Sequence, residues 1–487
     1  MSALTALARV SAVAEGVAQP IATVRHVHLS ARPLVFIPLS LAGEANAPLA
    51  ALVGSSPDAP QLLVVPQPRN RDQRFDFAAR LAAVVVSYVD SFCGDTETVT
   101  VDRGRDVRER YLDAPQILVP NGGGAGFVRL FGRSTRLRRT MGEWAVDPSV
   151  PLLGRWLTFF AERAEYPGSS LLVGMTGALS QHWATGQSAV EDANLAALIG
   201  WIDPPAGLTG AEAALEAEDP LRWPPAGPAT DPTFDNEILS PAIESGSLSR
   251  LESALHSQLQ PTWELMWRGV GLLRQLPPGA RVEQRWADDR DAFTGFAQYV
   301  AEGGYPQPRL DGAVAAAQRL ARLERAQAMY DAQRAYDDPL VLAEYRLTGE
   351  AFAGAVVASA PDRVDESGKR RVLRPHVTVR TADPVRLTPG TQVVSPVRPS
   401  QTGTIVSVVG SGSFSDVTLE LSGGMGRSLT APPGSVPVVG EELTYTTVKD
   451  AYVAPAPFPS RDETPWTHGG PPVEYVPDDE DAAEEWA

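Results

Sequence analysis

Apolar residues follow two patterns along the chain, short runs and longer stretches at helical spacing. In residues 1–150, four short apolar runs are bounded by Pro, Gly or Asp, as is typical of buried strands. Phe75–Phe92 repeats apolar residues every three or four positions and predicts an amphipathic helix. We therefore expect residues 1–150 to form an α/β domain with at least one crossover helix. The four predicted strands are Val24–Leu29, Leu34–Leu39, Gln61–Val65 and Gln116–Val119.

Residues 151–350 show mainly helical spacing. An apolar face at Leu153, Trp156, Leu157 and Phe160 opens the region, and the same spacing returns further along it. Residues 203–235 are rich in Pro and acids and predict an extended connector. The pattern therefore predicts a mainly α-helical middle region. Its other helical stretches are Asn194–Trp201, Leu251–Leu276 and Asp311–Tyr336.

Residues 351–450 change to short β-branched runs separated by Gly, Pro and Ser turns. Regular spacing of such runs predicts a small all-β barrel, SH3-like or OB-like. Residues 451–487 hold seven prolines and a strongly acidic end, so we expect a disordered Pro-rich acidic tail. The barrel strands expected are Ala355–Ala358, Val377–Val379, Thr404–Val409, Val417–Leu421 and Leu443–Thr446.

The residue counts exclude several classes of site. Cys93 is the only cysteine, so the chain has no intramolecular disulfide and no cysteine-based metal centre. Lys369 and Lys449 are the only lysines, and neither stands in the G-x-x-x-x-G-K-[ST] context of a phosphate-binding P-loop. No apolar stretch is long enough for a transmembrane helix, and the N-terminal 20 residues lack the charge pattern of a signal peptide. We expect a cytoplasmic protein without a bound cofactor or metal.

Charge is distributed unevenly along the 487 residues. The formal net charge of -17 argues against a uniformly basic nucleic-acid binder. Residues 1–150 nevertheless carry 16 arginines against 14 acids, a net charge of +2. Residues 151–350 carry 15 arginines against 27 acids, a net charge of -12. A local cationic site in the first region is therefore compatible with the acidic whole.

An arginine cluster near the end of the first region is the strongest candidate site. Five arginines occur within eleven residues that include no acid: Arg129, Arg133, Arg136, Arg138 and Arg139. Guanidinium forks match phosphate oxygens and stack on bases, so the cluster predicts nucleic-acid contact. In a helix Arg129, Arg133 and Arg136 share a face, whereas in a strand Arg136 and Arg138 do. Two alternatives remain open: a cationic edge that docks on the acidic middle region, and a sheet-edge guard against aggregation.

Two patterns near predicted strands suggest chemistry that the local sequence does not complete. The run Asn121–Gly126 contains four glycines after a predicted strand, but it does not fit G-x-G-x-x-G, and we expect a flexible hairpin or surface loop. Glu44 and Gln61 flank strands in the layout of metal-dependent nuclease cores, which need a second carboxylate and usually a lysine. The segment from Gln61 to Gln67 offers neither, so we expect no catalysis there.

Histidines and acids provide weaker candidates. His26 and His28 would share one strand face, but no third metal ligand is nearby, and His182 lacks a nucleophile motif. Asp288, Asp289 and Asp291 fit a solvated helix start better than a cation site. These residues indicate neither a metal site nor a catalytic site.

Two sets of residues are candidates for binding a protein partner. Trp263 and Trp267 are four residues apart on a predicted helix, where core or interface anchoring is expected. The acids of the tail offer a charged docking segment. These acids are Asp478, Asp479, Glu480 and Asp481.

Three functions are compatible with this organisation. The first is a non-catalytic accessory or adaptor protein of a nucleic-acid-processing or defence complex, whose partner is a helicase or nuclease. The second is a protein-binding scaffold that uses the Trp-bearing helices and the tail. The third is a hydrolase with an unrecognised site. The lack of a complete catalytic motif favours the first two over an enzyme.

Overall fold

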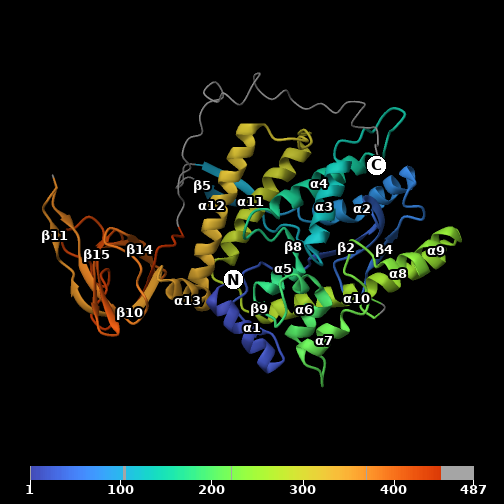
Figure 1. Ribbon diagram of the computed structural model, residues 1–487. Coiled ribbons are helices and arrows are strands. Elements are labelled where there is room, and N and C mark those ends of the chain that lie inside the picture. The colour runs from blue at the N-terminus through green and yellow to red at the C-terminus, as the bar shows by residue number, and fades with distance from the viewer. Residues whose placement is uncertain (1, 102–105, 221, 369, 451–487) are drawn as a thin grey trace. The chain divides into compact units, whose positions relative to one another are not determined.

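The computed structural model describes residues 2–101, 106–220, 222–368 and 370–450 (Figure 1). This part of the chain has mixed α/β content, with many helices and a closed β-barrel in the C-terminal half. It divides into two compact units. The sheet unit comprises residues 7–20 and 24–323, and the barrel unit comprises residues 2–6, 21–23 and 324–450. The acidic tail at 451–487 lies outside the described residues.

A five-stranded sheet forms the centre of the sheet unit. Its strand order is β4-β3-β2-β7-β8, with antiparallel pairing from β4 to β2 and parallel pairing from β2 to β8. The parallel pairs require crossover connections, which helices supply. The strands are β2 (Leu34–Leu41), β3 (Glu44–Gly54), β4 (Gln61–Val64), β7 (Ile117–Val119) and β8 (Leu172–Gly174).

Successive residues of β2 feed two hydrophobic cores on opposite faces of this sheet. Phe36 lies in the core on one face and Ile37 in the core on the other, because side chains alternate along a strand. The first face is covered by α2 (Arg71–Asp90), α3 (Gly122–Thr135), α4 (Ser149–Arg163) and α11 (Val282–Ala301). The second is covered by α5 (Met175–Ser180), α6 (Leu195–Ile202), α9 (Ser240–Glu244) and α10 (Leu248–Gln275). Burial on both faces explains the continuous apolar run of β2.

Shorter elements surround this sheet. A hairpin of β5 (Thr96–Val101) and β6 (Asp106–Tyr111) forms a separate two-stranded sheet, and β1 (Gln19–Pro20) pairs with β9 (Trp183–Ala184). Within the predicted connector at 203–235, a capping box between Thr209 and Glu212 begins α7. The other helices of the sheet unit are α7 (Gly210–Glu216) and α8 (Pro232–Phe234), with a 3-10 turn at Glu191–Ala193 and a π-helical turn at Asp235–Leu239. Helices α1 (Ala3–Glu15) and α12 (Ala313–Asp337) have residues in both units, and α13 (Pro339–Thr348) belongs to the barrel unit.

The strand predicted at Val24–Leu29 is wrong, and side chains explain why. The backbone N–H groups of His26, His28 and Ser30 donate to the side chains of His182, Ser170 and Gln116, at 3.0 Å each. Buried polar backbone groups need partners, and here side chains take the place of a neighbouring strand. Apart from an isolated bridge between Arg25 and Pro278, the segment pairs with no strand of the described chain.

The barrel unit contains a closed barrel of six strands in the order β10-β13-β16-β15-β14-β17. Closure pairs the edge strands, and inward side chains such as Phe352, Val379 and Tyr445 fill the interior. Gly354 is required where strands approach, since a Cβ there would lie 1.9 Å from the Arg380 carbonyl oxygen. The strands are β10 (Ala351–Ala360), β13 (His376–Thr381), β14 (Gln392–Ser395), β15 (Arg398–Ser411), β16 (Phe414–Ser422) and β17 (Glu442–Thr446), and a small ribbon of β11 (Val364–Asp365) and β12 (Val372–Leu373) accompanies them.

Candidate functional site

The glycine-rich run after β7 is the first turn of α3, so the prediction of a surface loop is wrong. The Asn121 side chain accepts a hydrogen bond from the Gly124 N–H at 3.0 Å and caps the helix. Glycine has low helix propensity, and the run carries no apolar periodicity that would reveal a helix. The cap and the packing of α3 on the sheet supply what the local sequence lacks.

This first turn is covered by another segment of the sheet unit. The Asn121 side-chain amide donates to the Gly227 carbonyl oxygen at 3.1 Å. A Cβ on Gly123 would lie 2.8 Å from Cδ of Pro228, so glycine permits the close approach. The glycines therefore serve packing, and residues 227–228 lie against the first turn of α3.

The arginine cluster lies at the other end of α3. Arg129 and Arg133 are on the helix, and Arg136 is its C-cap residue, so the helical alternative describes the cluster. At spacings of four and three residues, the three side chains fall on one face. That face meets α4 at close range, because Gly132 and Gly154 leave room for the opposite backbone.

A pocket of about 200 Å³ opens at this face. Arg309 and Arg319 join the α3 arginines, so five guanidinium groups line it together with three carboxyl groups. Sequence reasoning missed Arg309 and Arg319 because they lie more than 170 positions after Arg136 and only the fold brings them there. The lining residues are Arg129, Arg133, Arg136, Thr158, Ala161, Glu162, Glu165, Pro308, Arg309, Leu310, Asp311 and Arg319.

Arg136 has a structural role in this pocket. Its side chain is 3% exposed, and its Nε and Nη2 donate to the carbonyl oxygens of Gln307 and Pro308 at 2.8 Å each. The Gln307 side-chain amide in turn donates to the Arg155 carbonyl oxygen at 3.0 Å. These contacts hold residues 307–308 against α3 and α4 and position the Arg309 and Asp311 side of the pocket.

The other arginines differ in what they contact. Arg129 pairs with Glu165 at 2.6 Å, and Arg319 pairs with Glu165 and, at 3.4 Å, with Asp311. Arg133 is exposed, and its side chain makes no ion pair or hydrogen bond within the described residues. The pocket thus combines guanidinium groups held by protein carboxylates with one that faces solvent.

Burial and neighbouring charges shift the pKa values of the pocket residues in opposite directions. Burial raises the pKa of Glu162, while Arg319 and Arg136 act to lower it. Burial alone would lower the pKa of Arg319, but Glu165 and Glu162 raise it above its ordinary value. With five arginines against three carboxyl groups, the lining has a formal excess of positive charge and suits an anion.

Arg138 and Arg139 lie outside the pocket lining. The Nε of Arg138 donates to the Ser134 carbonyl oxygen at 2.9 Å, and its guanidinium lies 5.3 Å from the ring centre of Phe75. Both side chains are partly exposed. The fold therefore brings together three of the five clustered arginines and directs the other two elsewhere.

The Trp candidates pack inside the sheet unit. Trp263 is 1% exposed and donates from Nε1 to the Pro57 carbonyl oxygen at 2.9 Å. Trp267 is partly buried against the same core, 5.9 Å from the Trp263 ring centre. This burial leaves no indole surface of Trp263 for a partner. The acidic candidates Asp478, Asp479, Glu480 and Asp481 lie outside the described residues.

The histidine candidates are structural. His26 and His182 are buried, and the His182 ring nitrogen accepts from the His26 backbone. His28 stacks on Trp286 with ring centres 4.0 Å apart, and burial lowers its pKa to about 4, although Asp113 acts to raise it. Within the described residues, no group of three His, Cys, Asp or Glu side chains could hold a metal ion.

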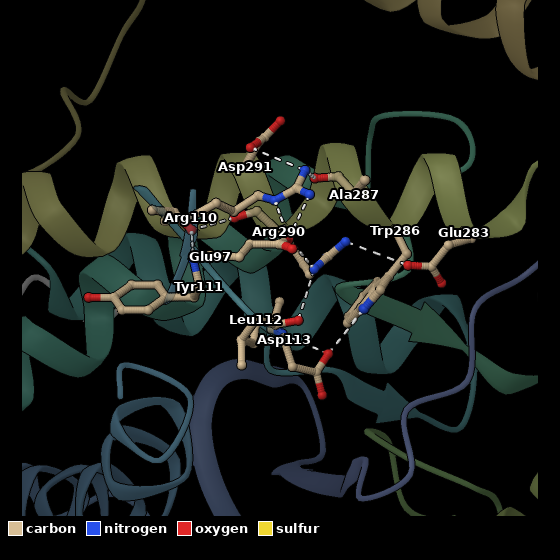
Figure 2. Close-up of polar contacts among 12 residues, drawn as sticks. Glu97, Arg110, Tyr111, Leu112, Asp113, Glu283, Trp286, Ala287, Arg290 and Asp291 are labelled. Carbon is tan, nitrogen blue, oxygen red and sulfur yellow. Dashed lines mark hydrogen bonds and ion pairs between the residues drawn. The ribbon is translucent and has the colours of Figure 1, made fainter. Parts of the chain in front are cut away.

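The acids of α11 take part in a polar network with the hairpin of β5 and β6, shown in Figure 2. Arg110 pairs with Glu97 at 2.7 Å and with Asp291 at 3.6 Å, and Arg290 pairs with Glu97 at 2.8 Å. Asp289 is 1% exposed and accepts from Arg163 at 3.0 Å. These contacts fasten the hairpin and α4 to α11.

Glu44 and Gln61, which flank strands in the sequence, lie at the starts of two different strands. Glu44 begins β3 and forms an ion pair with Arg69 at 2.8 Å, and Gln61 begins β4. Glu44 and Gln61 are therefore strand-start residues, and the acid of the pair already has a cationic partner.

Comparison with known proteins adds no relative. No protein-family model matches the chain, and the searches of curated proteins and of solved structures also return no match. Among the described helices, none combines the length and the hydropathy that crossing a membrane requires. A proposal about function therefore rests on the geometry of the pocket.

Proposed function

We propose that this protein is a non-catalytic, cytoplasmic accessory or adaptor of a nucleic-acid-processing or defence complex. One observation carries the proposal: α3 presents Arg129 and Arg133 at a pocket to which the fold adds Arg309 and Arg319. Guanidinium forks bind phosphate oxygens in two-point contacts, and such contacts position a protein on a nucleic-acid backbone without reading its sequence.

The local charge favours this ligand over a neutral one. Five arginines converge on the pocket although the whole chain has a net charge of -17. Phosphate contacts release condensed counterions, so binding would depend steeply on salt. Arg138 and Arg139 at the end of α3 extend the cationic segment beyond the pocket.

The barrel is proposed to contribute a second contact. We assign it to the small SH3-like or OB-like barrels, whose members bind oligonucleotides or protein segments. Its partner in this proposal is a helicase-like or nuclease-like protein of the same complex. The acidic end at 474–487 is negatively charged, as nucleic acid is. In this proposal the two compete for the same cationic surface.

Fluorescence anisotropy of labelled single- and double-stranded oligonucleotides tests the proposal. The wild type should bind at about 50 mM salt and lose affinity steeply towards about 200 mM. Replacing Arg129 and Arg133 by Ala should weaken binding and reduce the slope of log K against log salt by about two, one for each phosphate contact.

Arg250→Ala is the matched control, because Arg250 is an exposed helical arginine of α10 outside the pocket lining. It should leave both affinity and slope unchanged. An unchanged affinity of the Arg129→Ala, Arg133→Ala double variant, or no wild-type binding at low salt, would contradict the proposal.

A further inference from the structure

Glu165 sits in the pocket as an anionic ligand of two arginines that come from distant parts of the chain. Arg129 reaches it from α3 at 2.6 Å, and Arg319 reaches it from α12. Glu165 itself lies two residues after the end of α4. A single carboxylate is thus held between two guanidinium forks, which is the arrangement that such forks also offer to a phosphate.

The three side chains are accessible enough for exchange. The side chains of Arg129, Arg319 and Glu165 are 48%, 28% and 25% exposed. Ion pairs at this degree of exposure contribute little to stability, so an incoming anion has little to overcome. A phosphate group offers more negative charge and more acceptor oxygens than a carboxylate, and charge-assisted contacts with it are correspondingly strong.

A third guanidinium is already placed for the incoming group. Arg133 lines the same pocket one turn from Arg129 and makes no contact with a carboxylate in the described chain. Arg136 does not compete for the ligand, because it is committed to the carbonyl oxygens of Gln307 and Pro308. Release of Glu165 would leave Arg129, Arg133 and Arg319 facing one space.

We propose that Glu165 occupies the position of a phosphate group, and that a phosphate group bound in the pocket displaces it from Arg129 and Arg319. This inference deepens the proposed function and rests on it for the source of the phosphate, the nucleic-acid backbone. Glu165 then acts as an internal competitor that keeps the affinity of the site low. Its removal strengthens binding, whereas removal of the arginines weakens it.

The test compares Glu165→Gln with the wild type by the same anisotropy titration. The variant should bind about twofold to fivefold more tightly, the range expected when one partly exposed ion pair no longer competes. Its salt slope should stay close to that of the wild type, because Arg129 and Arg319 contact the phosphate in both proteins once Glu165 is displaced.

Glu216→Gln is the matched control for charge. Glu216 pairs with Arg222 at 2.9 Å outside the pocket, and its replacement changes the net charge by the same amount. This variant should bind like the wild type. Equal gains in both variants would show a general charge effect and overturn the inference, while the loss in the Arg129→Ala, Arg133→Ala variant would still support the proposed function.

A second measurement separates the pocket from the nucleic acid. Inorganic phosphate should raise the melting temperature of Glu165→Gln more than that of the wild type, and adding Arg129→Ala to Glu165→Gln should remove the gain. If phosphate shows this pattern and oligonucleotides do not bind, the inference stands with a free phosphate compound as ligand and the proposed function fails. If Glu165→Gln gains neither phosphate nor oligonucleotide affinity, the displacement is excluded.

Discussion

At the residue scale, His28 shows how packing determines the protonation of a half-buried histidine. Its ring stacks on Trp286, its backbone N–H donates to the Ser170 hydroxyl, and its carbonyl accepts from Gln116. Burial disfavours the imidazolium form and lowers the pKa of His28 to about 4. The folded state therefore prefers a neutral ring at pH values where the unfolded chain begins to bind a proton.

This preference predicts a pH dependence of stability. Because the folded pKa is below the unfolded value, the unfolded state binds more protons between pH 6.5 and about 4. The contribution of His28 is complete above pH 6.5 and is lost as the pH falls through this window, by about 2 kcal/mol at pH 5. Urea unfolding of wild type and His28→Gln at pH 7.5 and 5 measures it.

The His28→Gln variant should lose less stability between these pH values than the wild type does. His256→Gln, a change at an exposed histidine of α10, should retain the full wild-type difference. Equal pH dependence in wild type and His28→Gln would show that burial of His28 does not control its protonation.

At the scale of elements, the crossing of α3 and α4 places the arginines beside the acids. A Cβ on Gly154 would lie 2.2 Å from the backbone nitrogen of Arg136, and one on Gly132 would lie 2.8 Å from that of Thr158. Only a hydrogen at these two positions lets the helices approach so closely. The pocket lining from both helices depends on this spacing.

Gly154→Ala should therefore destabilise the protein by about 1–3 kcal/mol, the usual cost of overpacking a close contact. Gly126→Ala is the control within α3, because a Cβ there meets no atom within 4 Å. It should raise stability by about 0.5–1 kcal/mol through helix propensity. Equilibrium urea unfolding of the two variants checks both signs, and a neutral Gly154→Ala would contradict the packing argument.

At the scale of the whole molecule, the barrel has the attributes of an independently stable body. Closure removes its free edges, and its interior is a separate hydrophobic cluster built around Phe352 and Tyr445. Arg346 of α13 adds a two-point ion pair with Asp383, at 2.7 and 2.9 Å.

A fragment of residues 339–450 should consequently fold alone. We expect a strand-dominated circular dichroism spectrum and one cooperative thermal transition. The same fragment with Gly354→Val should fail to fold, because the new side chain would collide with the Arg380 carbonyl. A disordered spectrum of the unmodified fragment would show that the barrel needs the rest of the chain.

Periodicity in the sequence was sufficient where an element is long or its pattern is pure. The predicted helix at 75–92 corresponds to α2, the runs at 34–39 and 61–65 to β2 and β4, and the β-branched runs to barrel strands. Periodicity failed where a strand is very short, and where side chains take the place of a neighbouring strand as hydrogen-bond partners. Strand β8 has three residues inside a region predicted to be helical, and Val24–Leu29 pairs with side chains.

The candidate site was predictable only in part. Arg129, Arg133 and Arg136 are close in sequence, so helical spacing was enough to place them on one face. Arg309, Arg319 and Glu165 come from other segments, and nothing local links them to α3. Folding decides whether each arginine binds carbonyl oxygens, pairs with a carboxylate or faces solvent, because it determines which groups lie beside it.

The sequence by itself determined the class of the protein: mixed α/β content, a β-barrel late in the chain and an arginine cluster within an acidic whole. These are local properties, since periodicity, turn residues and charge spacing act over a few positions. The tertiary structure alone decided that the glycine run begins α3 and that Trp263 lies in a core. It also set Glu165 between Arg129 and Arg319, because residues so far apart in the sequence meet only when α3, α4 and α12 have packed.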